Sequence, residues 1–213
     1  MIALPPINLL INRCRALSAL DLILSPEWQY RFYSFNAHWS DQEQMASMRD
    51  GCGNEWWIVF HREGWSALKG LGHESSAWSE HGEKISAALQ QSFPPAFKEF
   101  STEPAFRWNE TSFAYFHAVG GGGWTRVNDL AGYPTDETGE KELLEHLVGS
   151  PSDYAQFASD YYETEVDPRV VAQVFALHPI TPQIITSLNS STLLKDIVDE
   201  LQNEIGYPRA KGA

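Results

Sequence analysis

Four side chains that can move protons, bind metals or stack on a ligand lie in the segment 61–74: His61, Trp65, His73 and Glu74. Imidazole and carboxylate groups act in this way when a fold brings them together. Their spacing matches none of the tight metal motifs, His-Glu-x-x-His, Cys-x-x-Cys or His-x-His. We therefore expect no metal and no cofactor. The four residues form a candidate binding site, and the alternative is that His61 ends a strand and His73 hydrogen-bonds within a loop.

The glycine run at 120–123 is the other segment that resembles a known chemical motif. A phosphate-binding P-loop needs Lys followed by Ser or Thr directly after its last glycine, with a helix behind it. Here Trp124, Thr125 and Arg126 follow in an extended pattern, so we expect a hairpin connection. The nucleophile pattern Gly-x-Ser-x-Gly is absent from the sequence. No catalytic residue is assigned.

Tryptophan is abundant, with eight residues in the chain. Trp56 and Trp57 are adjacent in a segment that reads as a strand, so their side chains must point to opposite faces of a sheet. One of them can belong to the core. The other either lies under a second buried layer or contributes to an interaction surface, where Trp and Tyr are enriched. We include Trp57 among the candidate binding residues for this reason.

The charge is strongly acidic, with a net value of −13. Residues 135–167 hold ten acidic residues and one basic residue, Lys141. Such a surface repels phosphate backbones and anionic membranes, so we expect neither nucleic acid nor membrane as a partner. The acidic segment is either a solvated helical face or a docking surface for a basic protein.

The two cysteines do not indicate a disulfide framework. Cys14 falls on the apolar stripe of a predicted helix, where it would be a small core residue, whereas Cys52 lies in a glycine-rich turn. The apolar segment Ile7–Leu24 is interrupted by Arg13, Arg15 and Asp21. It therefore resembles neither a signal peptide nor a membrane span, and we expect a cytoplasmic protein.

The order of predicted elements is a helix at Ile7–Leu24, a β-rich part at about 27–130 and a helical part at about 136–206. Periodicity and turn residues predict the elements of the β-rich part. It begins with a strand at 29–36 and a short helix at 41–48, which a Ser40–Glu43 capping box opens. A hairpin of Glu55–His61 with 65–71 follows, then a helix at 83–91, a helical turn at 96–100 and a hairpin of 112–119 with 124–128.

In the last third, Ser150, Asp167 and Thr181 each precede a proline and should cap a helix. Strands that are grouped together indicate an α+β fold with a mainly antiparallel sheet. We expect a single α+β domain over residues 1–213.

Several segments resemble a family of uncharacterised bacterial proteins. The segment 50–60 reads DGCGNEWWIVF, and it is followed by Gly64, by the pair 69–70 (KG) and by the segment 73–75 (HES). The segments 160–163 (DYYE) and 205–208 (IGYP) add to this resemblance. It implies a bacterial cytosolic protein and supplies no activity. The acidic, Trp-rich α+β composition is also similar, at the level of class, to that of immunity proteins of bacterial toxin systems.

These observations favour a non-enzymatic protein-interaction module, of an immunity-like or regulatory kind, with a basic protein as its partner. The alternative is an enzyme, or a protein that binds a small ligand or metal, with its site near His61, Trp65, His73 and Glu74.

Overall fold

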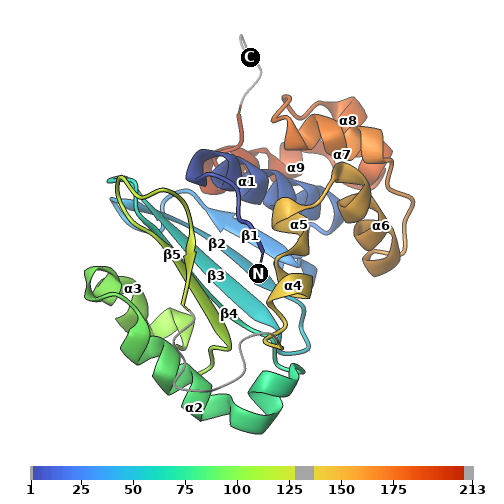
Figure 1. The fold of residues 1–213 in the computed structure, drawn as a ribbon. Coiled ribbons are helices and arrows are strands. Elements are labelled where there is room, and N and C mark those ends of the chain that lie inside the picture. Colours follow the sequence, from blue (N-terminus) through green and yellow to red (C-terminus); the bar gives the residue numbers. More distant parts are fainter. Residues whose placement is uncertain (1, 128–136, 209–213) are drawn as a thin grey trace.

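The chain folds into a six-stranded antiparallel sheet preceded by one long helix and followed by several shorter ones, as a computed structural model of residues 2–127 and 137–208 describes (Figure 1). This confirms the predicted α+β class. The first helix, α1, spans Ile7–Leu24, as the spacing of its leucines predicts. Cys14 is buried on its inner side, and Cys52 is exposed in its turn. None of the helices among residues 2–127 and 137–208 has the length and apolarity that crossing a bilayer requires.

The sheet is a meander in which each strand pairs with the next one along the chain. Its strands are β1 (Tyr33–Asn36), β2 (Glu43–Arg49), β3 (Glu55–His61), β4 (Ser66–Leu71), β5 (Phe113–His117) and β6 (Thr125–Arg126). Both predicted hairpins are present, as β3–β4 and β5–β6. The last residue predicted for the second hairpin, Asn128, lies outside the described residues.

The helix predicted at 41–48 is wrong, because this segment forms strand β2. The Ser40 hydroxyl does hydrogen-bond to the Glu43 carboxylate, at 3.1 Å. The contact lies in the turn between β1 and β2, where the backbone groups of Ser40 and Glu43 also bond to each other. The strand predicted at 29–36 begins only at Tyr33, after a 3-10 turn, η1, at Trp28–Tyr30.

Alternating side chains place a core on each face of the sheet. On β3, Trp56, Ile58 and Phe60 pack with α1 and the C-terminal helices, whereas Val59 packs on the other side. This second core lies under α2 (Ser76–Ser92), η2 (Pro95–Phe97), α3 (Lys98–Thr102) and η3 (Pro104–Phe106). Figure 1 shows the two helical layers on either side of the sheet. The helix predicted at 83–91 is the part of α2 that follows a kink at Gly82.

The C-terminal helices are short, and proline marks the start of three of them. They are α4 (Glu140–Leu143), α5 (Glu145–Val148), α6 (Pro151–Tyr161), α7 (Pro168–Phe175), α8 (Pro182–Leu188), α9 (Leu194–Asp199) and a π-helical turn, η4 (Glu200–Glu204). Ser150, Asp167 and Thr181 each accept a hydrogen bond from the first turn of their helix, as predicted. These caps satisfy amide groups that the helix itself leaves free.

The outer edge of β1 is closed by two contacts from other elements. The carboxylate of Asp21, on α1, accepts hydrogen bonds from the amides of Phe32 and Tyr33 at 2.9 and 2.7 Å. The carbonyl of Glu204 accepts from the amide of Ala37 at 2.7 Å. Both satisfy backbone groups that an edge strand would otherwise present to another chain. They also bring α1 and η4 to the side of β1, where the candidate site lies.

Candidate functional site

The four residues predicted from the segment 61–74 do not come together. His61 and Trp65 close one end of the β3–β4 hairpin and stack on each other, with ring centroids 4.6 Å apart. His73 and Glu74 follow the other end of β4 and are exposed. The backbone amide of His73 donates to Asn54, which precedes β3. The length of the strands therefore separates the two pairs by roughly 20 Å.

The conspicuous segment 50–60 has a structural role in this fold. The Asp50 carboxylate accepts hydrogen bonds from the amides of Cys52 and Asn54, at 2.8 and 3.0 Å, which closes the turn before β3. Gly53 has a φ of +108°, and a β-carbon there would lie 3.0 Å from the ring of His73. Ser75 caps α2 by accepting from the amide of Trp78. Much of the pattern thus specifies turns and a cap.

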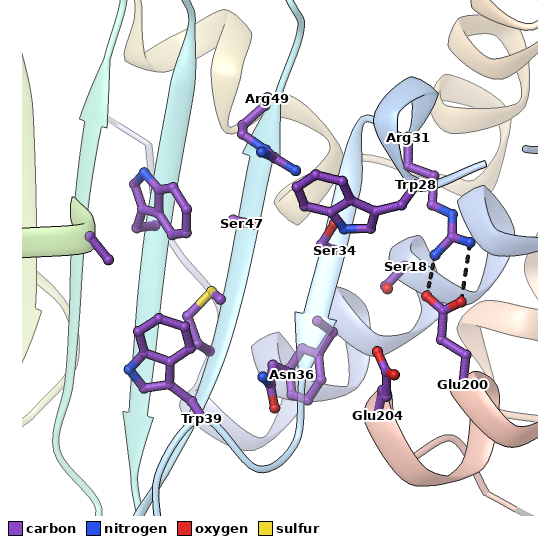
Figure 2. Close-up of a pocket in the computed structure, with 14 residues that line it drawn as sticks. Ser18, Trp28, Arg31, Ser34, Asn36, Trp39, Ser47, Arg49, Glu200 and Glu204 are labelled. Carbon is purple, nitrogen blue, oxygen red and sulfur yellow. Dashed lines mark hydrogen bonds and ion pairs between the residues drawn. The ribbon is translucent and has the colours of Figure 1, made fainter. Parts of the chain in front are cut away.

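A cavity of about 280 Å³ lies over β1 and β2, on the sheet face that also carries the second core. We call it the tryptophan cavity (Figure 2). Its lining comes from α1, η1, strands β1 to β3, the segments that flank β1, η3 and η4. The lining residues are Ser18, Trp28, Arg31, Ser34, Phe35, Asn36, Trp39, Met45, Ser47, Arg49, Trp57, Ala105, Glu200 and Glu204.

The floor of the tryptophan cavity includes polar side chains, whereas the part of this sheet face under α2 and α3 is apolar. Ser34 of β1 pairs with Ser47 of β2, which pairs in turn with Trp57 of β3. The alternate residues of β1 and β2 contribute Tyr33, Ala46 and Met48 to the core on the opposite face. Strands whose side chains alternate between apolar and polar have one face against the core and one face towards solvent. On this face of the sheet, the second core therefore covers the strands from β3 onwards, whereas the tryptophan cavity lies over β1 and β2.

One wall is fixed by an ion pair between distant segments. Arg31 bonds to both carboxylate oxygens of Glu200, on η4, with the contact to Oε2 at 3.2 Å. It also donates to the carbonyls of Ser25 and Pro26, which precede η1. All of its polar contacts hold the chain in place, so Arg31 is a structural part of the wall.

The rim next to this wall is aromatic and exposed. Trp28, which lines the cavity, is 54% exposed, and Tyr30, two residues further along η1 and outside the lining, is 58% exposed. The guanidinium of Arg49, on β2, lies 4.0 Å from the centre of the Trp28 ring. This distance is that of a cation–π contact, which orients both groups. Burial lowers the pKa of Arg49, and the nearby Glu55 opposes this shift. The guanidinium remains charged, because the ordinary pKa of arginine is far above neutral.

The far side of the tryptophan cavity is formed by two further indoles. Trp39 stacks against Phe106 with centroids 5.8 Å apart, and Trp57 contacts the same ring at 5.4 Å. Phe106 belongs to the second core, so this core holds both indoles in position. The indole nitrogen of Trp57 is buried and has no hydrogen-bond partner among the residues described. Trp57 thus packs on the second core and also lines the tryptophan cavity.

The arrangement suits the binding of a ligand or partner. Its charged residues are two arginines and two glutamates, and it contains neither His nor Cys. No cluster of three or more His, Cys, Asp or Glu side chains is poised to hold a metal in the described ranges 2–127 and 137–208. Indoles, a guanidinium and hydroxyl groups around a hollow provide stacking and hydrogen bonds.

Of the residues around the tryptophan cavity, only Trp57 is predicted from the sequence as a binding residue. Two signals could have found the others. The polar residues Ser34, Asn36, Ser47 and Arg49 alternate with apolar ones along two segments, and Glu200 and Glu204 stand one helical turn apart. Neither signal shows that these segments meet. Comparisons with protein-family models, with curated proteins and with solved structures find no match to this chain, so its site is interpreted from its own residues alone.

Proposed function

We propose that this chain is a non-enzymatic protein-interaction module, of an immunity-like or regulatory kind, that recognises a basic protein. The observation that carries the proposal is the exposed Trp28 beside Arg49, at the mouth of the tryptophan cavity, with a second exposed aromatic side chain, Tyr30, in the same turn η1. Trp, Tyr and Arg are the residue types that dominate binding energy at protein interfaces, and they act best around a pocket.

The charge of the chain supports a basic partner. Among the acidic residues of the segment 137–167, Glu140, Asp153 and Asp167 serve the fold through an ion pair or helix caps. Five others are exposed and make no ion pair with any described residue: Glu142, Glu145, Asp160, Glu163 and Glu165. Together with a net charge of −13, these side chains would attract a basic protein and speed its association.

The test is a pull-down with the tagged chain from cells that naturally express it, at low and high salt, analysed by mass spectrometry. We expect a basic protein in stoichiometric amount that is released at high salt, because screening weakens charge-steered binding. The Trp28→Ala/Tyr30→Ala variant should lose it. The matched control is Val119→Ala, because Val119 is 62% exposed and lies on the β5–β6 connection, away from the rim.

Two results would contradict the proposal. One is that no protein is retained at either salt concentration. The other is a partner that the rim variant and the Val119 control retain equally, because the rim would then contribute nothing to recognition.

A further inference from the structure

Three serine hydroxyls line the floor of the tryptophan cavity, and none of them makes a hydrogen bond within the described parts of the chain. Ser18 belongs to α1, Ser34 to β1 and Ser47 to β2, and Figure 2 shows them one after another across the hollow. We call these three residues the hydroxyl row. Ser18 and Ser47 are each only 3% exposed. Because buried polar groups normally have a hydrogen-bond partner, these two hydroxyls indicate a ligand that supplies one.

The hydroxyl row offers no opposite charge to a charged ligand. Arg31 and Glu200 neutralise each other in the wall. Arg49 stacks on Trp28 at one end of the hollow, and Glu204 is exposed towards the other end. A charged ligand on the row would lose its hydration without gaining an ion-pair partner beside it, which costs free energy. The floor therefore suits an uncharged ligand.

A wholly apolar ligand does not suit the hydroxyl row either. It would displace water and leave the buried hydroxyls unpaired, which is costly. Each serine hydroxyl can both donate and accept a hydrogen bond, so the ligand needs groups that do the same. Ser34 and Ser47 are cross-strand partners, and their β-carbons therefore lie roughly 5 Å apart. The hydroxyl groups on alternate carbons of a sugar ring have a spacing of this order.

The surfaces beside the hydroxyl row are aromatic. In Figure 2, Trp28 lies on one side of the row and Trp39 on the other, and Trp57 and Met45 also line the hollow. Phe106 of the second core contacts both Trp39 and Trp57 and holds them in position. A pyranose ring has C–H groups on its faces and hydroxyls around its edge. It can therefore pack on indole rings and hydrogen-bond to serines at the same time.

We propose that the tryptophan cavity binds a neutral sugar in the pyranose form. The hydroxyls at the edge of the sugar would bond to the hydroxyl row, and its C–H groups would pack on Trp39 and Trp57. The volume of about 280 Å³ lies just below the range of sites for drug-sized ligands, roughly 300–1,000 Å³, which suits a single ring. This inference goes beyond the proposed function, because it concerns a small molecule on the floor of the cavity and not the protein at its rim.

The experiment titrates the full chain with glucose, galactose, mannose and N-acetylglucosamine at millimolar concentration. Saturation-transfer NMR detects binding, and tryptophan fluorescence gives the affinity. For the tightest sugar, the amino sugar and the uronic acid with the same ring are titrated next, since each of them carries a charge. We expect saturable binding of a neutral sugar. Both charged relatives should bind at least about tenfold more weakly, because the floor has no opposite charge for them.

A double variant locates the site. Ser18→Ala/Ser47→Ala should weaken sugar binding at least about tenfold, because two hydrogen bonds to the ligand are lost. The matched control is Ser79→Ala, since Ser79 is exposed on α2 and its hydroxyl bonds to the carbonyl of Ser76. The control should bind like the unchanged chain. The double variant should also unfold at the same urea concentration as the unchanged chain or a higher one, because its missing hydroxyls have no partner in the described fold.

The proposal is overturned if no neutral sugar shows saturable binding, if a charged relative binds as tightly as the neutral sugar, or if the double variant and the Ser79 control bind alike. A double variant that unfolds at a lower urea concentration would also contradict it, because the hydroxyls would then stabilise the fold itself. These outcomes are independent of the pull-down. A basic partner that is lost on changing Trp28 and Tyr30 would support the interaction module even if no sugar binds. Conversely, sugar binding without any protein partner would support the small-molecule site alone.

Discussion

A buried ion pair shows how single residues determine the stability of the sheet beside the tryptophan cavity. Lys69 of β4 follows Ser34, Ser47 and Trp57 in the same cross-strand row. Its ammonium group is fully buried and donates to Glu55 at 3.1 Å and to the carbonyl of Glu110 at 2.8 Å. Burial lowers the pKa of Lys69, and the carboxylate of Glu55 opposes this shift. The fold therefore needs both partners.

Replacing Lys69 by Met should reduce the free energy of unfolding by about 3 kcal/mol, because it leaves a buried carboxylate without its buried partner. Urea denaturation measures the change. The double variant Lys69→Met/Glu55→Gln should recover part of it, since no unpaired charge remains. Arg107→Gln is the control, because Arg107 contacts the same carboxylate from a side chain that is 53% exposed, and it should cost less than about 1 kcal/mol. Equal stability of the single and double variants would contradict this account.

At the scale of elements, the close pairing of β4 with β5 depends on one glycine. Gly70 faces Phe113 across the two strands. A β-carbon at Gly70 would lie 2.1 Å from the ring of Phe113, which is itself 1% exposed. The ring is buried and cannot turn out into solvent, so a glycine is required here for close approach and not for backbone freedom.

We therefore expect Gly70→Ala to lower the free energy of unfolding by about 1–3 kcal/mol through overpacking. Thermal unfolding followed by circular dichroism measures it. Gly122→Ala is the matched control, since nothing lies within 4 Å of a β-carbon there and its φ is not positive. The control should unfold within a few degrees of the unchanged chain. If both variants unfold at the same temperature, the packing of Phe113 against Gly70 is not tight.

The elements that sequence reasoning predicted correctly are those whose signal is local. The apolar spacing predicts both ends of α1 correctly, and the residues that precede proline predict the starts of three C-terminal helices. At 41–48 the Ser40–Glu43 capping-box pattern predicts a helix, whereas the segment forms strand β2. Its pairing with β1 and β3 decides its conformation, and no local signal reports that pairing. Strand preference depends on such neighbours more than helix preference does.

The candidate site was harder to predict than the fold for the same reason. The tryptophan cavity joins Trp28 and Arg49 to Glu204, which is far along the chain. The site predicted from the sequence instead consists mainly of residues that are close in sequence, from His61 to Glu74. Antiparallel pairing separates them, because His61 and His73 lie at opposite ends of the hairpin. In a hairpin, residues that are close in sequence also lie close in space only near the turn, as the stacked His61 and Trp65 illustrate.

At the scale of the whole molecule, two buried titratable groups tie α1, β1 and the C-terminal helices together. Asp21 accepts from the hydroxyl of Tyr154, on α6, at 2.6 Å, in addition to its bonds to β1. His146, on α5, contacts the hydroxyl of Tyr33 at 2.6 Å through Nδ1. Burial raises the pKa of Asp21 to about 6 and lowers the pKa of His146 to about 4. Hydrogen bonds oppose the first shift, and Asp153 opposes the second.

The two shifts act on stability with opposite signs over the same pH range. Between about pH 4 and 6 the folded chain keeps the proton on Asp21 that the unfolded chain loses, so this group makes the free energy of unfolding fall as pH rises. Over about pH 4 to 6.5 the unfolded chain protonates His146 and the folded chain does not, so this group makes the free energy rise with pH. Each effect amounts to at most about 3 kcal/mol, and the two largely cancel.

Removing either group should therefore reveal how the free energy of unfolding depends on pH through the other group. Relative to the unchanged chain, His146→Gln should lose stability as pH rises from 4 to 6, and Asp21→Asn should gain it, each by up to about 3 kcal/mol. Urea denaturation at a series of pH values measures both. His178→Gln is the control for the first, because His178 is exposed and should leave the profile unchanged. If Asp21→Asn does not fold, His146→Gln alone carries the test, and a profile parallel to that of the unchanged chain would show that burial does not lower the pKa of His146.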